Sequence, residues 1–203
     1  MKRSKGKETE EAPAAKKKPG PFWRAMLANH LRSCEKAGTE LYKDERIIAV
    51  LDAYPKARKH ALVCPRGKKP LASISEAVPQ DLPLIRDIIA QAESIQKKWL
   101  LEGVPSKIGF HGRPSLEPLH LHIISLDFQS PALKNKKHWN SFNGPFFRSP
   151  QEVVAELEKE GKVDASFEKW ERYLKDDLIC CGETFATMPK LKAHLDSDSH
   201  KME

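Results

Sequence analysis

The chain has 203 residues, with 39% hydrophobic and 31% charged side chains, a formal net charge of +7 and a pI near 9.2. This length allows one domain of ordinary size plus a small appendage. No apolar run approaches the length of a membrane helix, and the N-terminus lacks the apolar segment of a secretory signal, so we expect an intracellular protein without a membrane segment. The basic excess favours an anionic partner, with nucleic acid first.

Residues 1–21 combine Lys, Glu, Ala, Pro and Gly with few large apolar side chains, which predicts a disordered basic tail. Two basic clusters, Lys2-Arg3 and residues 16–18, are separated by a spacer like that of a two-part nuclear localisation signal. We therefore predict location in the nucleus. A cytoplasmic location, with a tail that only adds solubility, is the alternative.

Residues 22–38 carry apolar side chains at helical spacing and end at Gly38, a helix stop, which predicts an amphipathic helix. Phe22 and Trp23 stand at its start. Such aromatic residues usually pack into a core, but beside arginines they can also stack on a nucleic-acid base. Both roles stay open for this pair.

Four strand-like segments and one long helix follow. Residues 46–52 and 60–65 are close enough in sequence to form an antiparallel hairpin, and residues 107–111 and 119–126 predict two further strands. Apolar residues at helical spacing predict the longest helix over 81–103. Helices that pack on one face of an antiparallel sheet give an α+β fold.

Imidazole and apolar side chains alternate along the strand expected over 119–126. Because successive side chains of a strand point to opposite faces, His120 and His122 must share one face, and the leucines and isoleucine between and beside them must share the other. Two neutral imidazoles side by side can bind a metal, attack an electrophile or transfer protons near neutral pH. A half-exposed strand with incidental histidines is the alternative.

The C-terminal region, with helices expected over 150–161 and 167–174, contains four residues that commonly bind zinc. These are Cys180, Cys181, His194 and His200. Their spacing is that of a small finger with two cysteines and two histidines, apart from the missing C-x-x-C. Adjacent cysteines reach one zinc ion only across a distorted turn, so a metal-free finger is the alternative. In a folded finger, the helix 189–195 would present Lys190 and Lys192 to a DNA backbone.

Two segments carry a resemblance to a known family. Residues 52–56, Asp-Ala-Tyr-Pro-Lys, are similar to the nucleotide-binding turn of the histidine-triad superfamily. Residues 120–142, with their Leu-Lys-Asn-Lys-Lys-His-Trp run, resemble the aprataxin branch, whose members remove AMP from adenylated DNA ends. The resemblance covers residues 22–200 and implies a histidine-triad fold, an antiparallel sheet with packed helices, followed by a small C-terminal zinc finger.

The superfamily motif is His-Φ-His-Φ-His-Φ-Φ, where Φ is apolar, and Pro118 stands here in place of its first histidine. The resemblance implies that His120 is the nucleophile, which forms a covalent histidine–AMP intermediate, and that His122 is the third motif histidine. His111 corresponds to an additional active-site histidine of the family. We expect it to act as the acid and as a phosphate contact.

Phosphoryl transfer depends mainly on positioning and on charge stabilisation at the nonbridging oxygens. We assign this stabilisation to His122, Ser115 and Lys134, although Ser115 as a turn cap and Lys134 as a solvated lysine are alternatives. By the resemblance, Asp52 and Lys56 lie at the nucleotide, where Asp52 accepts from the ribose hydroxyls.

A basic track for DNA is expected beside the active site. Its residues there are Lys136, Lys137 and Trp139, which would continue the surface formed by Lys190 and Lys192.

The expected function is that of a monomeric DNA-repair hydrolase. Its partners are DNA with 5′-adenylated nicks or ends and RNA–DNA junctions, its product is AMP, and its zinc is structural, with no catalytic metal. The expected organisation is a tail (1–21), a catalytic domain (22–148) and a C-terminal helical and finger module (149–203), without a forkhead-associated domain. The alternatives are a general nucleoside phosphoramidate or dinucleotide hydrolase and a non-catalytic nucleic-acid-binding adaptor.

Overall fold

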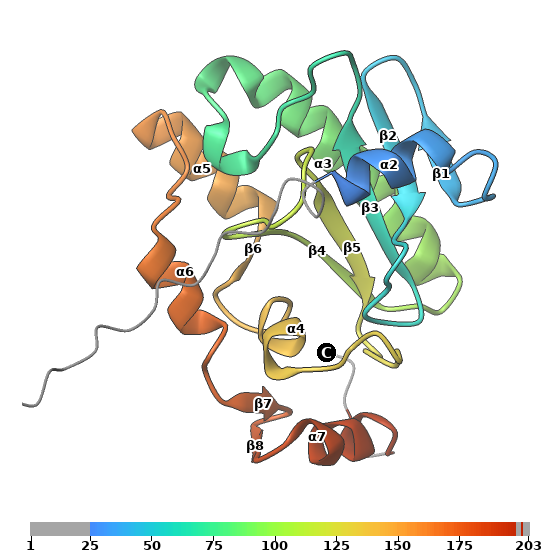
Figure 1. Cartoon of the computed structure of the whole chain (residues 1–203), viewed down its shortest axis with the longest axis vertical. Coiled ribbons are helices and arrows are strands. Elements are labelled where there is room, and N and C mark those ends of the chain that lie inside the picture. The colour runs from blue at the N-terminus through green and yellow to red at the C-terminus, as the bar shows by residue number, and fades with distance from the viewer. Residues whose placement is uncertain (1–24, 198–199, 201–203) are drawn as a thin grey trace, which may run out of the picture.

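A six-stranded sheet forms the centre of the computed structural model, which describes residues 25–197 and residue 200 (Figure 1). Every strand pairs antiparallel with its neighbours. In spatial order the strands are β1 (Glu40–Lys43), β2 (Ile47–Leu51), β3 (His60–Pro65), β5 (Leu121–Ser125), β4 (Ser106–His111) and β6 (Phe147–Arg148). The two predicted hairpins therefore lie side by side, joined by the pairing of β3 with β5.

One face of the sheet is covered by the long helix α3 (Leu82–Leu101) and by α5 (Pro150–Glu160). Two short 3-10 turns, η1 (Ile74–Glu76) and η2 (Pro79–Asp81), precede α3. The buried residues of α3 recur at helical spacing and are Ile85, Ile88, Ala92, Ile95 and Trp99. They pack with the apolar residues of β5 in the main hydrophobic core.

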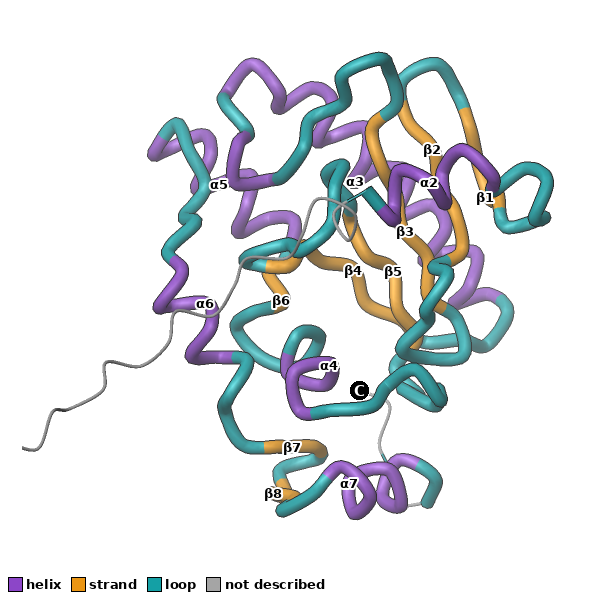
Figure 2. The backbone as a smooth tube through the Cα atoms, viewed as in Figure 1, coloured by secondary structure: helices purple, strands orange, loops and turns teal. Residues whose placement is uncertain are grey.

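The opposite face of the sheet is divided between two groups of elements (Figure 2). Helix α2 (Met26–Ser33) packs through Leu27 onto β2 and β3, in a small cluster that includes Leu62. Helix α4 (Lys136–Asn140) lies over the other end of β5. His111 of β4 and His122 of β5 lie on this face, with their rings in contact.

The C-terminal elements share a core with the sheet. They are α6 (Phe167–Tyr173), β7 (Leu178–Cys180), β8 (Glu183–Phe185) and α7 (Met188–Leu195). Leu178, Leu191 and Leu195 of this region pack in one cluster with Ile124 of β5 and with Trp139 of α4. The boundary that we expected at residue 148 thus separates segments that bury apolar surface against each other.

The α+β fold predicted from the sequence, an antiparallel sheet with packed helices, is confirmed, and so are its two hairpins and its long helix. The prediction omitted β1, β6, α4 and the two finger strands, all of which are five residues or shorter. Such segments are too short for hydrophobic periodicity to reveal them. Phe22 and Trp23, and the tail before them, lie outside the described residues.

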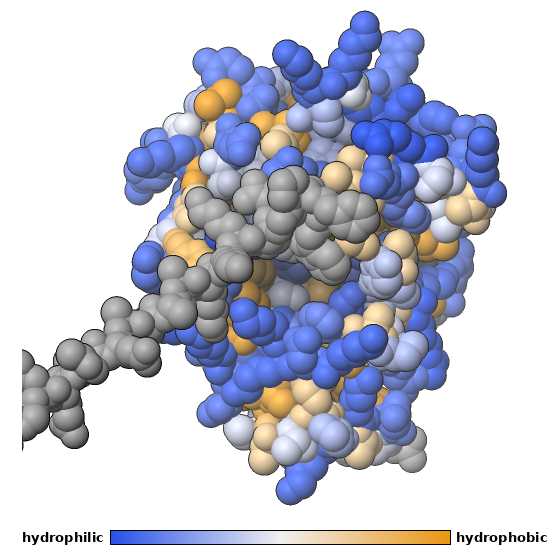
Figure 3. Space-filling view, viewed as in Figure 1, coloured by the Kyte–Doolittle hydropathy of each residue, from blue (hydrophilic) through white to orange (hydrophobic). Residues whose placement is uncertain are grey.

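The face of the molecule in Figure 3 is mainly hydrophilic, and its hydrophobic residues form separate patches. Within residues 25–197, no helix combines the length and the hydropathy needed to cross a membrane.

Candidate active site and metal centre

Four imidazoles meet on the face of the sheet opposite α3. His122 comes from β5 and His120 directly precedes that strand, while His111 comes from β4 and His60 from β3. The ring centroids of His111 and His122 are 4.1 Å apart. Leu121 of β5 points into the main core instead. The predicted alternation of chemistry and core along this strand is confirmed.

Hydrogen bonds fix which nitrogen of His122 carries a proton. The backbone N–H of Lys56 donates to Nδ1 of His60 at 3.2 Å, so the proton of a neutral His60 is on Nε2. That Nε2 lies 3.0 Å from Nδ1 of His122, which must accept. The proton of His122 is therefore on Nε2, where the described residues offer it no partner. His122 presents a buried N–H donor to the site.

His60 is neutral at physiological pH, because burial lowers its pKa to about 4. The carboxylate of Asp52 lies 3.3 Å from Nδ1 of His60 and partly opposes this shift, and the nearby Lys56 ammonium adds to it. Asp52 also accepts the backbone N–H of Tyr54 at 2.7 Å. This turn holds the carboxylate at the rim of the imidazole cluster.

His120 has one nitrogen bound and the other available. Its Nδ1 lies 2.9 Å from the carbonyl oxygen of Pro118, which can only accept, so Nδ1 carries the proton and Nε2 keeps its lone pair. Burial lowers the pKa of His120, although the bond to Pro118 and the charge of Asp52 oppose the shift. A neutral imidazole with a free Nε2 lone pair can attack phosphorus.

His111 completes the cluster. Its Nε2 is buried and, within the described part of the chain, has no hydrogen-bond partner. Burial, followed by the neighbouring imidazoles, holds the pKa of both His111 and His122 well below the usual range. Phe142, a residue that we did not single out in the sequence, packs against three of the rings, with centroids 4.9–5.3 Å away. Two buried nitrogens that lack partners indicate a site that a ligand completes.

These buried histidines predict that acid destabilises the fold. The unfolded chain binds a proton on each histidine near pH 6.5, whereas folded His60 does so only near pH 4, so the free energy of unfolding rises with pH across this window. We expect His60→Gln to have a smaller change in unfolding free energy between pH 6.5 and 4.5 than the native protein has. Urea unfolding at both pH values measures this, and equal changes in the two proteins would contradict it.

Lys56 and Lys134 lie at the edge of the site. Burial lowers the pKa of Lys56; the charge of Asp52 opposes this shift and the charge of Lys134 reinforces it. The Lys56 ammonium donates to the Tyr54 carbonyl. Lys134 is exposed. Ser115 is also exposed, in the loop between β4 and β5, and no polar contact joins its side chain to the histidines in the described structure.

The loop that contains Ser115 is held by the C-terminal segment. A Cβ atom on Gly112 would meet the ring of Trp170 at 2.4 Å, so only glycine fits where α6 packs on the loop. Arg113 stacks on Phe167 with 4.2 Å between its guanidinium carbon and the ring centre. Its Nη1 also lies 3.8 Å from a carboxylate oxygen of Glu171. No pattern in the sequence indicated these contacts.

The predicted basic track beside the active site is only partly available. Trp139 is 2% exposed and its ring N–H donates to the Ile179 carbonyl at 3.2 Å. The prediction that Trp139 contacts nucleic acid is therefore wrong, because a buried ring has no free face for a base. Lys136 and Lys137 are more exposed and lie 3.4 Å from Asp177 and 3.2 Å from Glu171, respectively.

The two lysines assigned to the finger surface lie on α7. Lys190 is exposed in the first turn of α7, where its backbone N–H donates to the hydroxyl of the N-cap residue Thr187. Lys192 is half-buried, and its ammonium donates to the Ser130 carbonyl at 3.3 Å. The structure thus leaves Lys190 as the more accessible of the two.

The four predicted zinc ligands converge at the C-terminus. The sulfurs of Cys180 and Cys181 are 3.7 Å apart, and Nδ1 of His200 lies 3.6 and 3.7 Å from them. A tetrahedral zinc ion has S···S and S···N edges of about 3.8 and 3.6 Å. His194 brings a fourth ligand atom, and all four lie within 4.8 Å of one another. The donor set therefore fits zinc.

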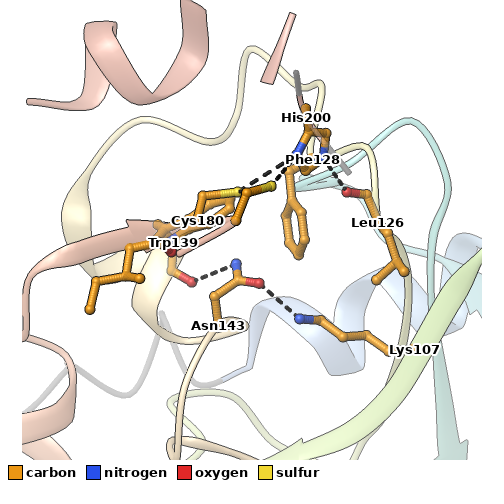
Figure 4. Close-up of a pocket in the computed structure, with 9 residues that line it drawn as sticks. Lys107, Leu126, Phe128, Trp139, Asn143, Cys180 and His200 are labelled. Atoms are coloured by element: carbon orange, nitrogen blue, oxygen red, sulfur yellow. Dashed lines mark hydrogen bonds between the residues drawn. The ribbon is translucent and has the colours of Figure 1, made fainter. Parts of the chain in front are cut away.

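The expected distorted turn between the cysteines is present. Cys181 has φ of 50°, in the left-handed region, and Gly182 follows with φ of 78°. This turn directs the two adjacent sulfurs to the same side, which extended backbone cannot do. A cavity of about 410 Å³ opens beside the thiols, and it is lined in part by Lys107, Phe128 and Asn143 (Figure 4).

The sequence of the chain was compared with those of known proteins and families. A sequence model described as the scavenger mRNA decapping enzyme C-terminal binding family matches residues 25–138, more than half of the chain, and a model of C2HE, C2H2 and C2HC zinc-binding fingers matches residues 143–201. Aprataxin of Gallus gallus is 40% identical over 159 residues, which is 77% of this chain and 49% of that protein. The chain therefore belongs to the family whose model matches residues 25–138, and it is similar to aprataxins.

Other aprataxins are also similar to this chain. The one from Danio rerio is 38% identical over 77% of the chain, which spans about half the length of both vertebrate relatives. The solved aprataxin orthologue Hnt3 from Schizosaccharomyces pombe has a TM-score of 0.62 at 28% identity and covers 83% of this chain and 89% of its own. A structure of Hnt3 with DNA and guanosine gives a TM-score of 0.63 at 27% identity, over 83% of this chain and 91% of that one. The resemblance to aprataxins predicted from the sequence is confirmed.

Proposed function

We propose that this aprataxin homologue is a DNA-repair hydrolase that removes AMP from 5′-adenylated DNA ends, including those at RNA–DNA junctions. The observation that carries the proposal is the state of His120. Its Nδ1 is bound to the Pro118 carbonyl, and its Nε2 lone pair is available beside two imidazoles whose Nε2 atoms have no partner in the described structure. This is the arrangement that a nucleophile and its charge-stabilising neighbours require.

The reaction has two steps. Nε2 of His120 attacks the phosphorus of the AMP group, a P–N bond forms, and the P–O bond to the terminal phosphate of the DNA breaks. Water then attacks the same phosphorus and loses a proton to the solvent, the P–N bond breaks, and AMP leaves with a neutral His120 restored. One difficult displacement is thus divided into two easier ones.

The neighbouring groups act on the charge that moves during these steps. The Nε2–H of His122, held by the bonds from Lys56 through His60, donates to a nonbridging oxygen of the adenylate phosphate. Burial leaves His111 neutral in the free protein, and the negative charge of the bound phosphates would raise its pKa, so that it serves the departing DNA phosphate as acid and contact. A phosphate is a better leaving group than an alkoxide, so this assistance can be modest.

The substrate is held by groups around the cluster. Asp52 accepts from the ribose hydroxyls, and Lys56, Lys134 and Ser115 contact the phosphates. The proximity of Asp52 to His60, at 3.3 Å, and of Lys56 to both Asp52 and Lys134 supports this placement.

DNA is proposed as the partner for two reasons. The solved relative Hnt3 forms a complex with DNA, and this chain carries a net charge of +7. Lys190, together with Lys136, Lys137 and Lys192, supplies cations on the finger side, and we propose that one structural zinc ion folds this side. The two basic clusters of the tail support location in the nucleus.

A substrate panel tests the proposal. We expect the purified protein to release AMP from adenylated nicked DNA at least about a hundredfold faster than from small AMP phosphoramidates and dinucleotides, because only DNA engages the basic surface. The readout is radiolabelled AMP at several substrate concentrations. Equal rates on DNA and small molecules would instead support a general nucleotide hydrolase, and DNA binding without release would support a non-catalytic adaptor.

A further inference from the structure

His200 contacts both the finger and the catalytic part of the chain. Its Nδ1 faces the sulfurs of Cys180 and Cys181, while its Nε2 lies 3.0 Å from the carbonyl oxygen of Leu126 (Figure 4). Since the carbonyl can only accept, Nε2 carries the proton and Nδ1 keeps the lone pair that a metal needs. Metal-binding histidines are commonly oriented by such a bond from the other ring nitrogen.

Leu126 directly follows β5, the strand that contains His122. The residues that follow it are bonded to the turn that precedes β3. The Oδ1 atom of Asp127 accepts the backbone N–H of Arg58 at 3.0 Å, and the hydroxyl of Ser130 donates to the Pro55 carbonyl at 2.5 Å. Segment 126–130 therefore holds residues 52–59 in place through these two hydrogen bonds.

Two further hydrogen bonds join segment 126–130 to the finger. The side-chain amide of Gln129 donates to the Leu195 carbonyl at 3.3 Å, and Lys192 donates to the Ser130 carbonyl at 3.3 Å. Both partners belong to, or end, the helix α7. The bond from His200 differs from these two because its donor residue is also a candidate metal ligand.

We propose that His200 is a positioning residue that couples the zinc centre to the nucleotide-binding turn. The ring binds zinc through Nδ1 and, through Nε2, holds the Leu126 carbonyl, so that zinc keeps segment 126–130 and the turn 52–59 in place. This inference rests on the proposed zinc site and adds to it: the metal orders part of the substrate site as well as the finger.

The variant His200→Cys separates the two roles of the ring. A thiolate is a good zinc ligand, so a site with three cysteines and one histidine still binds one zinc ion per chain, but it cannot donate to Leu126. We expect the backbone amide of Arg58, which is bonded to Asp127, to exchange with deuterium about tenfold faster in this variant. Exposed Thr184 of β8 provides the control, since Thr184→Ala alters neither zinc content nor exchange.

Kinetics on adenylated DNA give a second readout. Because His200→Cys changes no group that bonds directly to His120 or His122, we expect KM to rise about fivefold or more with kcat within about threefold of native. A purely structural role would lower the folded fraction, and hence apparent kcat, without raising KM.

The exchange experiment decides the inference independently of hydrolysis. A zinc-loaded His200→Cys protein with native exchange at Arg58 overturns it and leaves the proposed function intact. If the variant binds less zinc, native protein stripped with a chelator takes its place, and exchange at Arg58 is compared with exchange at the amides of β2. A larger rise at Arg58 supports the coupling, and equal rises, which global destabilisation would give, overturn it. Native protein that contains no zinc overturns both the zinc site and this inference.

Discussion

Replacing His120 by alanine is expected to lower kcat/KM on adenylated nicked DNA by about 10⁴- to 10⁶-fold. The variant loses the atom that bonds to phosphorus, and none of the remaining imidazoles replaces it. The Nδ1 of His122 is occupied by His60, at 3.0 Å, and its Nε2 carries the proton. The measurement is AMP release at substrate concentrations well below KM, where transition-state stabilisation is compared directly.

His30→Ala is the matched control for this variant. His30 is an imidazole of α2 that lies 2.7 Å from the Leu51 carbonyl and makes no contact with the other histidines in the described structure. Its loss is expected to change kcat/KM by less than about tenfold. Native-like activity of His120→Ala would contradict the assignment of the nucleophile. Equal losses in the two variants would show that the effect comes from the fold rather than from this ring.

Removing zinc is expected to destabilise the whole chain. Three leucines of the finger region, Leu178, Leu191 and Leu195, are buried in a core with residues of β5 and α4, and each buried leucine contributes about 1.5–3 kcal/mol. At about 2–4 °C per kcal/mol for a chain of this size, Cys181→Ser should lower Tm by at least about 10 °C. Because the core is shared, one unfolding transition should remain rather than two.

Cys34→Ala is the control for the cysteine variant. Cys34 is a free buried thiol at the C-terminal end of α2 and lies outside the four-residue cluster. It should leave the zinc content at one ion per chain, as measured by inductively coupled plasma mass spectrometry, whereas Cys181→Ser should reduce it to well below one. A finger that melts separately in Cys181→Ser, while the rest keeps its native Tm, would contradict the shared core.

The fold was largely predictable because its main elements have strong local patterns. The alternation along β5 and the helical spacing of α3 place apolar residues on one side, and the structure buries those same residues. The pairing of β3 with β5 was not predicted, since it joins residues that are about 60 positions apart. The packing of the finger onto Trp139 was missed for the same reason, and it reversed the expected exposure of that ring.

The residues of the candidate site could be predicted from the sequence, whereas the hydrogen bonds that join them could not. The sequence identified His111, His120 and His122 and the four finger ligands, and the structure brings each set together. The protonation states could not be deduced, because they depend on backbone groups of Lys56 and Pro118 that no side-chain pattern reveals. The contact from His200 to Leu126, the residue after β5, likewise involves a backbone carbonyl.

The most direct test of the account is to locate the transferred nucleotide. The protein is mixed with adenylated DNA, the reaction is stopped under alkaline conditions that preserve a phosphoramidate, and the peptides are sequenced by mass spectrometry. AMP should be attached to His120 and absent from His120→Ala. AMP attached to His111, His122 or a lysine, or full turnover by His120→Ala, would contradict the proposed mechanism.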